Sequence, residues 1–115
     1  MTTKVVLLGL KTSIIEDAME KVQDPAFEFV PCTKLAELKT ALEKGDIAHV
    51  VMGSGLDIDS RLEAVRTVFE TSNSTYVHMK KQDDGPQGYA PFIKMVLAGA
   101  KQKQTGIGTA SMNVV

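Results

Sequence analysis

The sequence contains a single cysteine, Cys32, among its 115 residues. One thiol cannot close a disulfide within the chain or supply a cysteine-based zinc site, and sparse cysteine is typical of reducing compartments. The sequence also lacks any apolar run near the ~18 residues of a membrane span. The apolar segment at the N-terminus is too short for a secretory signal. We therefore expect a cytoplasmic protein with no membrane partner.

The sequence also lacks an excess of charge of either sign. Its 13 Lys and Arg residues nearly balance 14 Asp and Glu residues, for a net charge of −1. Proteins that bind nucleic acid usually present a basic face, so we expect no nucleic-acid partner. The hydrophobic content of 43% and charged content of 23% are those of an ordinary globular domain.

Four apolar, β-rich runs alternate with helical patterns along the chain, at residues 4–10, 27–30, 47–52 and 75–79. Each intervening segment is long enough for a helix, which favours parallel strands and right-handed connections. The sequence predicts a three-layer, flavodoxin-like or Rossmann-like α/β fold with a four-stranded parallel sheet in the order 2-1-3-4. We expect one domain over residues 1–100, followed by a polar, flexible tail over residues 101–115.

Serine-glutamate pairs at capping-box spacing mark the expected starts of two helices, Ser13 with Glu16 and Ser60 with Glu63. In the third helix, helical spacing predicts a buried stripe of Leu62, Val65, Val68 and Phe69. In the fourth helix, over residues 90–100, the same spacing predicts that the core-facing residues are Phe92, Met95, Val96 and Gly99.

The layout resembles the receiver domains of bacterial signalling without their last strand and helix. A receiver has an acidic pair just after its first strand, where this chain has Gly9, Leu10 and Lys11. It has a phospho-accepting aspartate at the end of strand three, where Met52 and Gly53 stand. Without carboxylates to hold Mg²⁺, phosphoryl acceptance has no chemical basis, so we exclude that activity.

A closer resemblance is carried by the segment Val50-Val-Met-Gly-Ser-Gly55, followed in the next helix by Phe69-Glu70. Over residues 48–79 the chain is similar to a group of small, functionally uncharacterised Rossmann-like proteins. This resemblance implies the α/β fold and supplies no activity.

A candidate ligand site lies where strands one and three end, since their carboxyl ends meet at one edge of a 2-1-3-4 sheet. Glycine there allows close approach to the backbone, and nearby lysine favours an anionic ligand. The predicted ligand-binding residues are Gly9, Lys11, Thr12, Gly53, Ser54, Gly55 and His78. The alternative is that the glycines only make a tight turn and that the residues near Lys11 only begin a helix.

The sequence predicts no metal site and identifies no cofactor. His49 begins strand three while His78 ends strand four, so we expect the two imidazoles at opposite edges of the sheet. We expect Asp57 and Asp59 to serve the start of the third helix rather than a metal ion.

Three functions compete on this reading. The first is a non-catalytic module that binds a small anionic ligand or a protein, favoured because no matched acid, base and nucleophile is evident. The second is a small enzyme that uses Ser54, Cys32 or His78 on an anionic or carbonyl substrate at the carboxyl edge of the sheet. The third, compatible with the first, is a homodimer formed through the open sheet edge or the C-terminal tail.

Overall fold

The structure is a computed structural model that describes residues 2–53, 55–80 and 86–104, and it confirms the predicted α/β fold. Its four strands form one all-parallel sheet in the predicted order β2-β1-β3-β4. The strands are β1 (Thr3–Leu8), β2 (Phe27–Cys32), β3 (Ile47–Met52) and β4 (Tyr76–Met79). The central strands β1 and β3 are apolar almost throughout because helices cover both of their faces.

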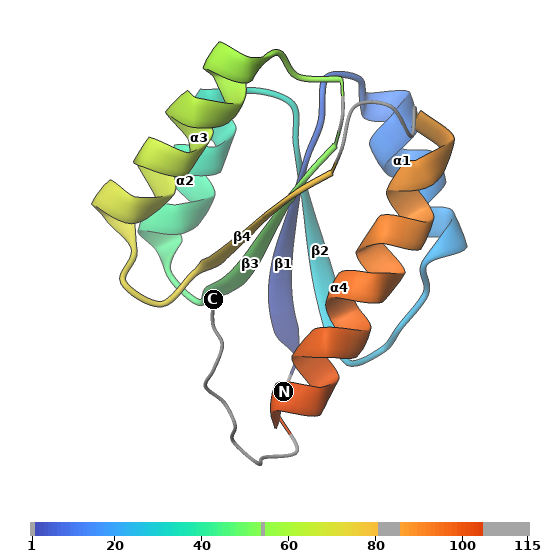
Figure 1. Ribbon diagram of the computed structural model, residues 1–115. Coiled ribbons are helices and arrows are strands. Elements are labelled where there is room, and N and C mark those ends of the chain that lie inside the picture. The colour runs from blue at the N-terminus through green and yellow to red at the C-terminus, as the bar shows by residue number, and fades with distance from the viewer. Residues whose placement is uncertain (1, 54, 81–85, 105–115) are drawn as a thin grey trace.

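Two helices cover each face of the sheet (Figure 1). They are α1 (Thr12–Lys21), α2 (Leu35–Lys44), α3 (Ile58–Thr71) and α4 (Tyr89–Gln104), the last preceded by a 3₁₀ turn, η2 (Pro86–Gly88). Helices α1 and α4 pack on one face, whereas α2 and α3 pack on the other. Because neighbouring strand residues point to opposite faces, Val5 and Leu7 join the first core while Val6 and Leu8 join the second.

Some boundaries differ from the sequence-based expectation. Strand β2 continues through Pro31, which pairs in register with Leu7 of β1. Proline is tolerated there because β2 is an edge strand that needs no donor on its outer side. Helix α4 runs to Gln104, past the expected end at residue 100, and residues 105–115 of the expected tail lie outside the described residues. No helix in the described ranges is long and apolar enough to cross a membrane.

The capping predictions were wrong at both helices. Helix α3 begins after Asp57, whose carboxylate accepts a 2.7 Å hydrogen bond from the backbone N–H of Ser60. Asp57 is therefore the N-cap of α3, and Ser60 donates its backbone N–H to that cap. Helix α1 begins after Lys11, which makes no capping bond with its side chain. A serine-glutamate spacing alone could not show which nearby side chain reaches the exposed amides.

We expect Asp57→Ala to lower the melting temperature more than Ser60→Ala, because only the first removes the acceptor at the start of α3. The N–H of Ser60 holds the pKa of the Asp57 carboxyl below its usual value. The cap therefore stabilises the fold fully above the ordinary carboxyl pKa of about 3.9 and is lost as pH falls through the folded pKa. Thermal unfolding at neutral and acid pH should show the difference between wild type and Asp57→Ala shrinking in acid. Equal melting temperatures at neutral pH would contradict this cap.

Candidate functional site

At the carboxyl edge of the sheet, the backbone N–H groups of Gly9 and Gly53 already donate hydrogen bonds within the fold. The N–H of Gly9 donates to the carbonyl of Cys32 at 3.1 Å, and the N–H of Gly53 donates to that of Leu8 at 2.9 Å. Both glycines are buried, and a Cβ on Gly9 would lie 3.2 Å from Ile15 of α1. Gly9 thus lets α1 pack close to the sheet, and neither N–H points to a ligand.

Tyr89, the first residue of α4, occupies the space beside Gly53 where the sequence predicted a ligand. Its side chain is 1% exposed, and a Cβ on Gly53 would lie 3.6 Å from its ring. The Tyr89 hydroxyl donates to the carbonyl of Val51 at 2.7 Å and lies 3.4 Å from that of Leu8. Burial raises the pKa of this phenol, so it remains a neutral donor. Tyr89 therefore links the start of α4 to the carboxyl ends of β1 and β3.

The other predicted ligand-binding residues divide into separate groups. Lys11 and Thr12 are exposed at the start of α1. Gly55 is exposed, and a Cβ there would lie 3.2 Å from Leu10, so the loops after β1 and β3 touch. Ser54 lies outside the described residues.

The side chain of His78 meets that of His49, so the expectation that the two imidazoles lie at opposite edges of the sheet was wrong. Nδ1 of His49 is 3.1 Å from Nε2 of His78. The cause is the register of two short parallel strands, in which His49 pairs with Tyr76 and Val51 pairs with His78. Two residues along a strand span only about 6.6 Å, so the two imidazoles on the same face of the sheet can meet.

The two histidines line a groove of about 360 Å³ between β4 and α4. His49 is 6% exposed and stacks on the ring of Tyr76, with ring centroids 5.6 Å apart, whereas His78 is half-buried. The other described residues that line the groove are Met79, Phe92, Met95, Val96, Gly99 and Ala100.

Sequence reasoning missed a buried arginine. Arg61, in the first turn of α3, is 6% exposed and donates through Nε to the carbonyl of Leu56 and through Nη1 to that of Lys80, both at 3.1 Å. Its Nη2 has no hydrogen-bond acceptor within the described ranges. Lys80 itself is 1% exposed. The available signal was spacing, because Arg61 shares the buried side of α3 with Ala64 and Val68.

Cys32 is separated from both histidines. It lies on β2, at the other edge of the sheet from β4, and packs in the core under α2 and α3, whereas the histidines line a groove beside α4. Burial, with a smaller contribution from the Glu37 carboxylate, raises the pKa of this thiol to about 11. These positions do not bring together the thiol and imidazole that a Cys–His enzyme needs.

We expect Cys32 to resist alkylation by iodoacetamide between pH 7 and 9. The thiolate is the reactive species, and a thiol with a pKa near 11 is almost entirely neutral in that range. Intact mass measured over time should show little added mass in the native protein and rapid addition in urea. Native alkylation as fast as in urea would contradict the buried, neutral thiol.

Exposed hydrophobic side chains are concentrated on β4 and on the helices α3 and α4. The described residues expose eight large hydrophobic side chains, and six of them lie on α3, β4 and α4. We call this set the β4 face: Ile58, Leu62, Phe69, Tyr76, Met79 and Met95. The prediction that Leu62, Phe69 and Met95 are buried in the chain was wrong, since they are 58%, 67% and 64% exposed.

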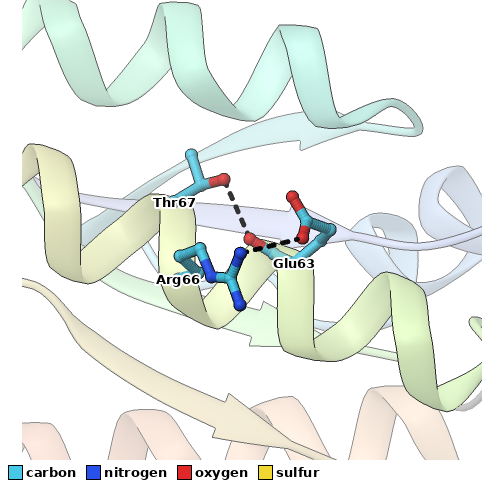
Figure 2. Close-up of polar contacts among 3 residues, drawn as sticks. All are labelled: Glu63, Arg66 and Thr67. Carbon is cyan, nitrogen blue, oxygen red and sulfur yellow. Dashed lines mark hydrogen bonds and ion pairs between the residues drawn. The ribbon is translucent and has the colours of Figure 1, made fainter.

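The exposed stripe on α3 is distinct from its polar side. Ile58, Leu62 and Phe69 recur at helical spacing on one side of the helix. Figure 2 shows another side, where the Thr67 hydroxyl donates to the Glu63 carbonyl at 2.9 Å and Arg66 lies 3.7 Å from the Glu63 carboxylate. Helix α3 is therefore polar and solvated on that side, and apolar on a side that the described residues leave uncovered.

Comparisons of the chain with family profiles, with curated proteins and with solved structures gave no match.

Proposed function

We propose that this chain is a non-catalytic interaction subunit that pairs with a second copy of itself through the β4 face. The observation that carries the proposal is the concentration of exposed apolar side chains on α3, β4 and α4. Single exposed hydrophobic residues are common on proteins, but a contiguous apolar surface is typical of a binding site. Here the exposed apolar residues lie on β4, the last strand of the sheet, and on α3 and α4, the helices on either side of it (Figure 1).

The size of the β4 face fits a dimer of ordinary stability. Large side chains such as Phe and Tyr bury roughly 150–250 Å² each. The six members are between 47% and 67% exposed, so together they offer on the order of 600 Å² of apolar area. A typical stable interface buries about 800 Å² per partner, much of it in a less apolar rim. The β4 face can therefore form most of one half of such an interface.

A second copy fits the charge and symmetry of the surface. In a dimer with a two-fold axis through this face, β4 of one copy lies beside β4 of the other. A charged residue on β4 would therefore lie close to the same charge on the other copy. From Tyr76 to Met79 the strand carries no acidic or basic residue other than His78. The net charge of −1 adds little repulsion between whole chains.

Mixed-isotope NMR tests this proposal. In an equimolar mixture of labelled and unlabelled chains, we expect intermolecular NOEs between the Met95 methyl group or Tyr76 ring and protons of the other copy. A monomeric protein, or intermolecular NOEs confined to the β2 edge, would contradict the β4 face as the interface. A stable mixed complex with a different protein and no self-association would also contradict the choice of a second copy.

One observation favours a second candidate, the binding of a small anion beside Arg61. A buried guanidinium with an unused N–H is unfavourable, and a phosphate or carboxylate oxygen would satisfy Nη2. Arg61 bonds to Leu56, in the loop that also contains the predicted residues Gly53 and Gly55.

Titration with inorganic phosphate at constant ionic strength tests the anion proposal. We expect saturable amide shifts between residues 53 and 61 in the wild type and their loss in Arg61→Gln, with Arg66→Gln as the control on the exposed side of α3. Shifts that do not saturate, or that persist unchanged in Arg61→Gln, would contradict it.

A further inference from the structure

We infer that the outer edge of β4 pairs with β4 of the second copy in the antiparallel direction, so that the two four-stranded sheets continue as one. This pairing rests on the proposed dimer and specifies how the copies recognise each other. They meet through main-chain hydrogen bonds made by Val77 and Met79, in addition to the apolar side chains of the β4 face.

The backbone groups of Val77 and Met79 point away from the sheet. Along a strand, successive residues turn their N–H and C=O groups to opposite edges. The N–H of Lys80 donates to the carbonyl of Met52 on β3 at 3.1 Å, so the backbone of Lys80 faces β3. Met79 and Val77 lie one and three residues before Lys80 and therefore face outward, where β4 has no neighbour in the described sheet.

The two edges of the sheet differ in the residues that discourage pairing. Charged residues and proline are common devices that keep an edge strand from pairing with another chain. At one edge, β2 carries the exposed Glu28 and also Pro31, which has no N–H to donate. At the other, the segment from Tyr76 to Met79 contains no proline, lysine or carboxylate. The outer edge of β4 is therefore the better template for a second strand.

Exposed apolar side chains lie on both sides of this edge. Leu62 and Phe69 belong to α3, which covers one face of the sheet, whereas Met95 belongs to α4, which covers the other. A contact between two α3 helices alone would leave Met95 exposed. A two-fold axis perpendicular to the sheet at the β4 edge places α3 beside α3 and α4 beside α4 of the second copy. Continuation of the sheet therefore covers both groups.

The alternation of the backbone also selects the centre of the strand pair. An outward residue must face an outward residue, so Val77 faces either Val77 or Met79 of the second copy. The second arrangement places His78 opposite His78, where two like charges would repel on protonation. The first places Tyr76 opposite His78 of the second copy, and we therefore centre the pair on Val77. A mixed-isotope sample should then show an intermolecular NOE between the Hα protons of Tyr76 and His78.

Amide hydrogen exchange followed by NMR tests the pairing. The wild type is measured at a concentration where sedimentation shows the dimer, and Leu62→Glu provides the monomer. We expect the N–H groups of Val77 and Met79 to exchange at least about tenfold more slowly in the wild-type dimer than in the monomer, because a hydrogen bond to the second copy protects them. The N–H of Lys80, which donates within the sheet, should be protected in both.

Val77→Pro provides a second test, with Val77→Ala as the matched control. Proline removes the N–H at the centre of the pair in both copies, whereas alanine shortens the side chain and keeps the N–H. An outward position on an edge strand accepts proline, as Pro31 does on β2. We expect the dissociation constant, measured by sedimentation, to rise at least about tenfold more in Val77→Pro than in Val77→Ala.

The outcomes distinguish this pairing from the dimer itself. A wild-type dimer in which Val77 and Met79 exchange as fast as in the Leu62→Glu monomer would overturn the pairing and leave the dimer intact. Equally slow exchange of both N–H groups in the monomer would show that another segment of the same chain covers the edge, and would also overturn it. A monomeric wild type would contradict both the dimer and the pairing. If Val77→Pro fails to fold, the exchange comparison still decides the question.

Discussion

Replacing Tyr89 by alanine is expected to remove about 3–5 kcal/mol from the free energy of unfolding, as for other large buried aromatic residues. The side chain is 1% exposed and fills the space above Gly53. Truncation leaves a cavity and also removes the donor to the Val51 carbonyl. Small domains have only about 5–15 kcal/mol of stability in total, so this single change should remove a large part of it.

Urea unfolding measures this effect, and Tyr76→Ala is the matched control because Tyr76 is 55% exposed. Both variants are best compared in a Leu62→Glu background, so that self-association does not contribute to the unfolding transition. There we expect Tyr76→Ala to cost at most about 1 kcal/mol. Tyr89→Phe, which removes only the hydroxyl, should cost about 1–2 kcal/mol. An unchanged midpoint for Tyr89→Ala would show that the tyrosine does not support the sheet.

Leu62→Glu is expected to convert a dimer to a monomer. Leu62 is 58% exposed on the apolar stripe of α3, and a two-fold axis places the new carboxylate in the interface twice. A disruptive change at the centre of an interface costs about 2 kcal/mol or more. Two such changes amount to about 4 kcal/mol, or roughly a 10³-fold increase in the dissociation constant.

Leu10→Glu is the control for this change. Leu10 has the same exposure, 58%, but follows β1 and lies outside the β4 face. Light scattering after size exclusion should give the wild-type mass for Leu10→Glu and the monomer mass for Leu62→Glu. Equal masses for the two variants would show that the chain does not associate through the β4 face.

The fold was predictable because its signals are local. Four apolar runs with helix-length crossovers predicted a parallel sheet, and its order 2-1-3-4 is confirmed. The ends of the elements were less predictable. The second strand was expected to end at residue 30, but it continues through Pro31 because the outer side of an edge strand tolerates proline. Asp57 rather than Ser60 caps α3, because capping depends on which side chain reaches the N–H groups.

The candidate site was much less predictable because it depends on contacts between distant segments. Helical spacing marks Leu62 and Phe69 as one apolar stripe but does not say whether the same chain or another covers it. The glycine at position 53 indicates close approach, yet nothing local shows that Tyr89, from the last helix, approaches it. The contact between His49 and His78 depends on strand register, which the separate strands do not reveal.

The most direct test of the proposed interface is sedimentation equilibrium of the wild-type chain over a wide range of concentrations. We expect a reversible increase in mass from 12.4 kDa to twice that value, with no larger species. The same measurement on Leu62→Glu should stay at 12.4 kDa throughout. A wild-type mass of 12.4 kDa at every concentration would contradict the β4 face as a site of self-association.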